Sequence, residues 1–145
     1  MFLNPRKLLI LFFSFSLFAC SSTSNNDQNT LYASIGGQTG IDKIVDNFIA
    51  EIVKDKQIFP YFAKSSVSHF RAGFIEHMCT ITGGPCRYNG DSMVDIHTGM
   101  NITEAHFNRV VELLIVAMEK ADVTYPVQNR ILAKLAPMRG EVIKR

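Results

Sequence analysis

The 145-residue sequence contains no tryptophan and only three cysteines, and its net charge is close to zero at +2. Its basic residues show no run typical of a nucleic-acid binder, so we expect no nucleic-acid partner. A hydrophobic content of 47% with 19% charged residues is too apolar for a disordered chain. The hydrophobic residues are also too dispersed along the sequence for a polytopic membrane protein. The length is sufficient for one domain with a single core.

Several motifs that carry chemistry are also absent. No two of the four histidines, His69, His77, His97 and His106, form an HExxH pattern or a Cys-rich pattern with zinc spacing. The sequence has no Cys-x-x-Cys-His, no GxSxG and no glycine-rich phosphate loop. This excludes a structural zinc site, covalent haem attachment through that motif and common hydrolase or nucleotide sites. A lone His97 near apolar residues is, by composition alone, most often an ordinary core or surface residue.

The first residues have the pattern of an export signal. Arg6 and Lys7 precede about a dozen apolar residues, too few to span a bilayer as a helix. The sequence Leu-Phe-Ala-Cys that ends at Cys20 resembles the lipobox of bacterial lipoproteins, in which this cysteine is lipidated after cleavage. We therefore expect a signal peptide over 1–19 and a lipid anchor on Cys20. An ordinary cleaved signal with a coincidental cysteine is the alternative.

The next segment, residues 20–30, is polar throughout after the cysteine and is expected to be a flexible tether. The residue after Cys20 is Ser21 and not the aspartate that tends to retain lipoproteins at the inner membrane. This favours an exported protein anchored to the outer membrane and facing the periplasm. Residues 20–145 contain 13 basic and 13 acidic residues, so the folded part has no charge excess toward an anionic partner.

From Leu31 onward the apolar residues follow helical spacing, which predicts an all-α fold for the domain over 31–145. One helix is expected around 41–53, after a glycine entry at 36–40 that stops any earlier helix. A turn without helix is expected at Pro60. A second helix is expected from Ser65 or Ser66 to about residue 81, ended by Gly-Gly-Pro. An irregular stretch over 86–101 precedes a long helix capped by Asn101 or Thr103, and a last helix begins near Pro126 and bends or shortens at Pro137.

The order of motifs along this part resembles the truncated haemoglobins, in particular their group I. The resemblance extends from about Leu31 to Val142. It rests on Gly36-Gly37, a helix with Phe48, a turn ending in Tyr61-Phe62, Gly83-Gly84-Pro85 followed by Tyr88-Asn89-Gly90, Met93-x-x-x-His97 and Ile102-Thr103-x-x-His106-Phe107. It implies a two-over-two helical sandwich with a non-covalent haem b, iron protoporphyrin IX. The partner implied is a diatomic gas, O2, NO or CO.

The resemblance also implies which residues contact the cofactor. His97 occupies the position of the proximal ligand of the haem iron. Phe62 matches an aromatic residue that stacks on the porphyrin. The other implied contacts are Phe48, Ile49, Phe70, Phe74, Met93, Ile102, Phe107, Val110 and Leu135. A wide apolar slot and one imidazole agree with what a porphyrin needs.

The sequence departs from the family on the distal side. Ile49 stands where the family usually has a tyrosine, and Phe70 and Phe74 stand where leucine or glutamine is common. A hydrogen bond to bound dioxygen contributes roughly 1.5 to 3 kcal/mol, so its loss speeds release about tenfold or more. Tight oxygen storage is therefore disfavoured, and NO or CO, which need less hydrogen bonding, suit the site better.

Three polar side chains near this region each have two interpretations. His69 is either a distal iron ligand or donor, or a residue that is exposed or touches a propionate. Arg71 either binds a haem propionate or is a solvated surface residue. His77 is expected to face solvent or to pack near Met78. His106 is expected to be structural.

Cys79 and Cys86 remain after Cys20 is lipidated, and an exported compartment permits a disulfide between them. Separate thiols, one in the core and one in a loop, are the alternative. Two functions stay open for the chain: a membrane-tethered gas-binding haem protein, or a haem-free globin-like lipoprotein that serves as a structural or partner-binding module. Catalysis such as NO dioxygenation requires an external reductase, since the chain has no flavin or nicotinamide motif.

Overall fold

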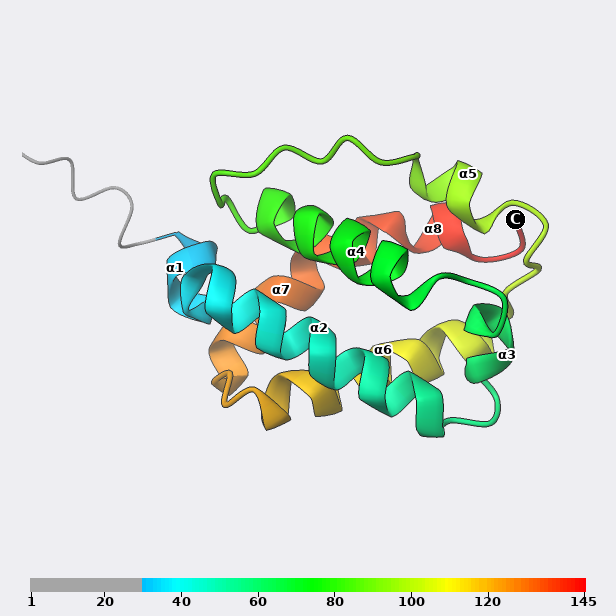
Figure 1. The fold of residues 1–145 in the computed structure, drawn as a ribbon, viewed down its shortest axis with the longest axis horizontal. Coiled ribbons are helices and arrows are strands. Elements are labelled where there is room, and N and C mark those ends of the chain that lie inside the picture. Colours follow the sequence, from blue (N-terminus) through cyan, green and yellow to red (C-terminus); the bar gives the residue numbers. More distant parts are fainter. Residues whose placement is uncertain (1–29) are drawn as a thin grey trace, which may run out of the picture.

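The computed structural model describes residues 30–145, and within that range the regular elements are all helical (Figure 1). This confirms the all-α prediction for the described part. The predicted signal peptide over 1–19, Cys20 and the tether up to residue 29 lie outside the described residues. None of the helices described combines the length and the apolar character needed to cross a membrane. The helices are α1 Leu31–Ile35, α2 Gly37–Lys54, α3 Phe59–Phe62, α4 Val67–Ile81, α5 Met93–His97, α6 Glu104–Lys120, α7 Tyr125–Leu135 and α8 Arg139–Val142.

The glycine-rich entry separates α1 from α2. Gly36 ends α1 in the left-handed region with a φ of 98°, which a glycine adopts without a steric penalty. The expectation that the glycines precede the helix is wrong for Gly37 and Gly40, because both lie inside α2. A side chain at Gly40 would collide with the carbonyl oxygen of Ile35. This glycine therefore lets α1 and α2 approach closely.

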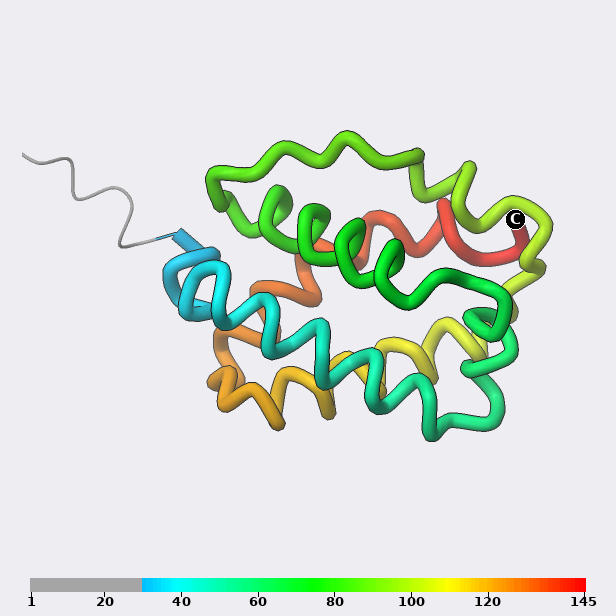
Figure 2. Tube along the Cα trace, in the orientation of Figure 1, coloured from blue at the N-terminus to red at the C-terminus, as the bar shows by residue number. Residues whose placement is uncertain are grey.

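Helix α2 is central to the packing, because α4 contacts it on one side and α6 on another (Figure 2). Its apolar residues recur at spacings of three and four and are buried along one stripe. Met78 of α4, Met118 of α6 and Ile131 of α7 are fully buried in the same core. The α2 residues in this core are Ile41, Ile44, Val45, Phe48 and Ile52.

The turn expected at Pro60 is instead a one-turn helix, α3, which begins one residue before the proline. Proline is tolerated in a first helical turn, because its missing N–H has no partner there in any helix. Asp55 prepares this turn, since its carboxylate accepts the backbone N–H groups of Gln57 and Ile58. Tyr61 then shares a 2.8 Å hydrogen bond with Nδ1 of His106, which joins α3 to α6.

Capping hydroxyl groups and prolines set the boundaries of the remaining helices. Of the two candidate caps before α4, Ser66 is the cap, and its hydroxyl accepts the N–H of His69. Thr103, not Asn101, caps α6 in the same way. Helix α7 begins one residue before Pro126, and the chain turns through a short 3-10 segment over Ala136–Met138, which contains Pro137, into α8. The expected interruption at Pro137 is confirmed.

Candidate functional site

The stretch over 86–101, expected to be irregular, contains the five-residue helix α5 that carries His97. Ser92 caps it: the serine hydroxyl accepts the N–H of Asp95 at 3.1 Å and lies 2.6 Å from that residue's carboxylate. This Ser-x-x-Asp pattern is the signal that could have predicted the helix. Helix α5 packs against α8, so the last residues of the chain support it from one side.

The imidazole of His97 is held in one orientation by its own helix. Its Nδ1 lies 2.7 Å from the carbonyl oxygen of Met93. Because a carbonyl can only accept, Nδ1 carries the proton, and the lone pair of the neutral ring is on Nε2. Such a second hydrogen bond commonly fixes the tautomer and direction of a metal-binding histidine. The His97 side chain is only partly buried.

Four phenylalanines from α2, α3 and α4 form an aromatic cluster. The rings of Phe70 and Phe74 stack with centroids 5.7 Å apart and an angle of 13°. Phe62 meets Phe70 edge-on at 5.0 Å, and Phe48 lies 5.4 Å from Phe74. The rings supply apolar surface and no hydrogen-bond donor. The structure thus brings together four of the predicted site residues.

Ile49 and Phe70 also line a small apolar pocket between α2, α3 and α4. The pocket extends outward to exposed side chains of Val53, Phe59 and Val67. Its lining is almost wholly apolar, and Ser65 is the polar residue among those that form it. The surroundings of Ile49 therefore provide no charged partner for a bound ligand.

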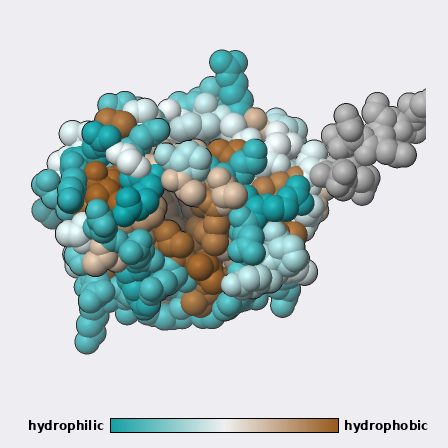
Figure 3. Space-filling view, turned by 180° about the vertical axis from the view of Figure 1, so that it is seen from behind, coloured by the Kyte–Doolittle hydropathy of each residue, from teal (hydrophilic) through white to brown (hydrophobic). Residues whose placement is uncertain are grey.

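The other predicted contact residues come from α5, α6, α7 and the connection between α5 and α6. Ile102 is buried, whereas Met93, Phe107, Val110 and Leu135 are half-buried. The guanidinium of Arg139 lies over the ring of Phe107, 5.7 Å from its centroid. The face opposite to that of Figure 1 shows an apolar hollow near its middle, ringed by polar side chains (Figure 3). The roles of these residues as cofactor contacts stay predictions.

The two polar candidates on α4 lie at its surface. His69 is exposed. Arg71 forms a two-pronged ion pair with Asp46 of α2, at 2.6 and 3.0 Å. This hydrogen-bonded pair lowers the pKa of Asp46. A propionate role for Arg71 stays a prediction, and it would require the guanidinium to leave or share this carboxylate.

Sequence reasoning missed the burial of His77. Solvent was one of its two expected surroundings, yet the side chain is 7% exposed and its pKa is lowered by desolvation. The ring of Tyr88 meets it edge-on at 5.2 Å. Tyr88 belongs to the loop after α4, so no periodicity within the helix could indicate this contact.

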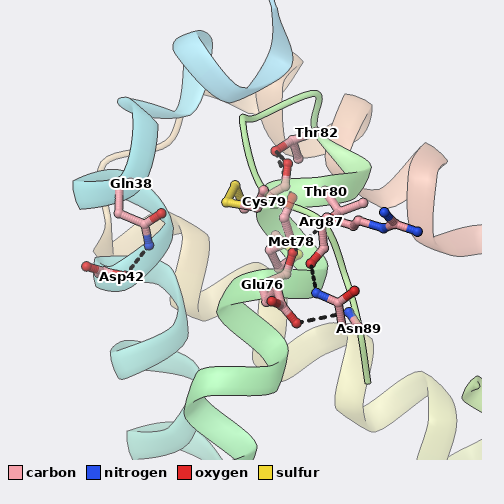
Figure 4. Close-up of a disulfide and its surroundings, with 10 residues drawn as sticks. Gln38, Asp42, Glu76, Met78, Cys79, Thr80, Thr82, Arg87 and Asn89 are labelled. Atoms are coloured by element: carbon pink, nitrogen blue, oxygen red, sulfur yellow. Dashed lines mark hydrogen bonds between the residues drawn. A yellow bond between two sulfur atoms is a disulfide. The ribbon is translucent and has the colours of Figure 1, made fainter. Parts of the chain in front are cut away.

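A disulfide between Cys79 and Cys86 holds the beginning of that loop against α4 (Figure 4). Of the two alternatives for these cysteines, the structure has the bridge. Gly84 makes the close approach feasible, because a Cβ atom there would lie 2.6 Å from both the sulfur of Cys79 and the ring of Tyr32. The backbone N–H of Asn89 also donates to the carboxylate of Glu76. Both ends of the segment 86–89 are therefore fixed to the helix.

In residues 30–145 no group of three or more His, Cys, Asp or Glu side chains could hold a metal ion by itself. A metal at His97 would therefore have to be brought by a larger group that supplies the other ligands. An all-helical domain that offers one oriented imidazole and a cluster of apolar aromatic rings has features of a globin.

Comparison with known proteins identifies the family. Residues 30–144 match the bacterial-like globins, and the chain belongs to this family. A group 1 truncated haemoglobin of Mycolicibacterium paratuberculosis is 29% identical over 113 residues, which are 78% of this chain and 83% of that protein. Another, of Tetrahymena pyriformis, is 25% identical over 118 residues, which are 81% of this chain and 98% of that protein. The predicted resemblance to group I is confirmed.

Solved structures confirm the two-over-two fold. The Fe(III) form of the T. pyriformis truncated haemoglobin has a TM-score of 0.77 at 24% identity, covering 80% of this chain and 99% of that one. The 2/2 haemoglobin of Synechococcus sp. PCC 7002, solved in the cyanomet state with covalently attached haem, has a TM-score of 0.74 at 21% identity over similar shares. These proteins consist almost wholly of the matched region. A domain of this extent therefore folds alone in those two proteins.

Proposed function

We propose that the domain binds haem b non-covalently, with Nε2 of His97 as the proximal ligand, and that it binds a diatomic gas reversibly on the opposite side. The observation that carries this proposal is the hydrogen bond from His97 Nδ1 to the carbonyl of Met93. It orients the ring and leaves Nε2 as the nitrogen that can offer a lone pair, as iron ligation requires. Haem b supplies the iron that binds O2, NO or CO.

The chain's own side chains fit this cofactor. A porphyrin is flat and apolar over most of its area, and its slot needs large apolar side chains on both sides. Phe70 and Phe74 provide stacked rings on one side, and half-buried residues such as Phe107 and Val110 provide apolar surface from α6. We propose that the aromatic cluster excludes water from the gas-binding side.

The choice of gas follows from what the distal side lacks. Ile49, Phe70 and Phe74 offer no hydroxyl, amide or imidazole to a bound ligand. A polar, oxygen-bound state is therefore left without the stabilisation of roughly 1.5 to 3 kcal/mol that a hydrogen bond gives. We propose that the site favours NO or CO over long-term oxygen storage. Any redox turnover would need an electron donor or reductase from outside the chain.

We further propose that the protein is exported and anchored to a bacterial membrane through lipidated Cys20. The disulfide between Cys79 and Cys86 supports this location, because such bonds persist in oxidising compartments such as the periplasm. Mass spectrometry of the protein isolated from bacterial membranes tests the anchor. We expect a diacylglyceryl adduct at Cys20, and Cys20→Ser is expected to release the protein into the soluble fraction.

The cofactor proposal is tested with residues 30–145 alone. We expect haem added to this apoprotein to give a saturable, intense Soret band, and carbon monoxide to shift the band of the reduced form. A protein that folds, as judged by far-UV circular dichroism, yet takes up no haem would overturn the proposal. That result would favour the haem-free, partner-binding alternative.

A further inference from the structure

His77 holds an unsatisfied polar atom in the interior. Its Nε2 is fully enclosed and makes no hydrogen bond within residues 30–145. Burial lowers the pKa of this imidazole, so the ring is neutral and carries one N–H. A buried donor or acceptor without a partner destabilises a fold, and native proteins rarely retain one without a reason.

The position of His77 on α4 places it on the aromatic side of the helix. Phe70, Phe74 and His77 follow at spacings of four and three, which puts them on one helical face. Phe74 stacks on Phe70 and also contacts Phe48. His77 therefore continues the wall that these rings form, about 10 Å further along the helix axis than Phe70 at 1.5 Å per residue.

The neighbouring loop encloses His77 but supplies no partner for its Nε2 atom. The ring of Tyr88 packs edge-on against the imidazole, while the Tyr88 hydroxyl donates to the backbone carbonyl of Asp91 at 2.9 Å. The carboxylate of Glu76, the adjacent residue, is engaged by the backbone N–H of Asn89. The Cys79–Cys86 disulfide holds this loop against α4 (Figure 4), and the His77 nitrogen stays enclosed beside the aromatic rings.

We propose that Nε2 of His77 donates a hydrogen bond to a carboxylate at the edge of the cofactor, one of the two propionates of haem b. This inference rests on the proposed function, because it requires a bound haem. The propionates are the polar groups of an otherwise apolar molecule and project from its rim. Because Phe70 and Phe74 are proposed to cover the gas-binding side, a residue about 10 Å further along the same wall would lie toward the rim of the cofactor. A neutral N–H facing a carboxylate makes a charge-assisted hydrogen bond.

The test compares two cofactors and three proteins. Residues 30–145 of the wild type, of His77→Phe and of Thr80→Val are loaded with haem b or with its dimethyl ester, whose propionates cannot be carboxylates. Transfer of each cofactor to an excess of a colourless apoglobin gives the dissociation rate. Thr80→Val is the control, since it removes a polar group from an exposed residue of the same helix.

We expect His77→Phe to release haem b about tenfold faster than the wild type. With the dimethyl ester, the two proteins should release the cofactor at the same rate. Thr80→Val should match the wild type with both cofactors. We also expect the His77→Phe apoprotein to melt at a higher temperature than the wild-type apoprotein, because the phenyl ring removes the unsatisfied nitrogen.

Three results would overturn the inference while leaving haem binding intact. They are equal release of haem b from both proteins, a faster release that persists with the ester, and a low-spin spectrum that His77→Phe abolishes. The last would make His77 an iron ligand. A lower melting temperature of the His77→Phe apoprotein would contradict the unsatisfied state of Nε2. Failure of the wild type to take up haem at all would overturn the proposed function and this inference together.

Discussion

Nδ1 of His97 lies 2.7 Å from the carbonyl oxygen of Met93, so a single hydrogen bond spans the whole of the five-residue helix α5. A helix this short is not stable by itself. Its cap at Ser92 and its contact with α8 hold it in place. The direction of the proposed iron ligand thus depends on a small, externally supported element.

Ser92→Ala removes the hydroxyl that accepts the N–H of Asp95. Loss of a serine cap costs about 1 kcal/mol, which corresponds to roughly a fivefold change in rate. We expect haem to dissociate about fivefold faster, as measured by transfer to an apoglobin. Ser92→Thr retains a capping hydroxyl and should behave like the wild type. Identical rates for all three proteins would show that the cap does not support His97.

Ile49→Tyr places a hydroxyl on the side where the aromatic cluster offers none. If the site lacks a donor, the new hydroxyl should slow dioxygen release by about tenfold or more, since the hydrogen bond contributes roughly 1.5 to 3 kcal/mol. Stopped-flow measurement of the release rate tests this. Ile49→Phe adds a ring without the hydroxyl and should have no comparable effect. Equal slowing by both variants would assign the effect to size.

The Cys79–Cys86 bridge closes a loop with a sequence separation of 7. Chain-entropy arguments assign a loop of this size about 2 to 3 kcal/mol of stability. We therefore expect the free energy of unfolding of the double variant Cys79→Ala/Cys86→Ala, measured by urea denaturation, to be lower by that amount. Dithiothreitol should destabilise the wild type similarly and leave the double variant unchanged. A wild type insensitive to the reductant would show that the bridge does not contribute.

Asp55 joins the α2–α3 turn to α6 through a 2.7 Å contact with Arg109. The hydrogen bond from Arg109 holds the pKa of this carboxyl below its ordinary value. A carboxyl with a lower pKa in the folded state adds stability above its unfolded pKa, and that stability is lost as the pH falls through the folded value.

Asp55→Asn should therefore lower the melting temperature at pH 7. The difference in melting temperature between the variant and the wild type should become smaller as the pH falls below about 4. Melting temperatures recorded from about pH 2.5 to 7, at intervals of roughly half a pH unit, cover the range in which this carboxyl titrates. Glu119→Gln, on the exposed side of α6, serves as the matched control. A difference from the wild type that stays constant with pH would contradict the electrostatic origin.

The sequence predicted the longer helices well, because α2, α4 and α6 each contain several turns of apolar periodicity and a glycine or hydroxyl signal at the start. It missed α1, α3 and α5, which are too short to show periodicity. The burial of His77 and the pairing of Cys79 with Cys86 depend on how the loop after α4 folds back. Such contacts between separate segments leave no local pattern in the sequence.

The most direct measurement of the central claim compares His97→Ala with His69→Ala in the absorption spectrum of residues 30–145 with haem. We expect His97→Ala to lose the wild-type Soret band of the reduced and carbon monoxide-bound protein. His69→Ala should keep it, with a high-spin reduced spectrum like that of the wild type. A wild-type spectrum that survives in His97→Ala, or a low-spin reduced spectrum that His69→Ala abolishes, would contradict the account.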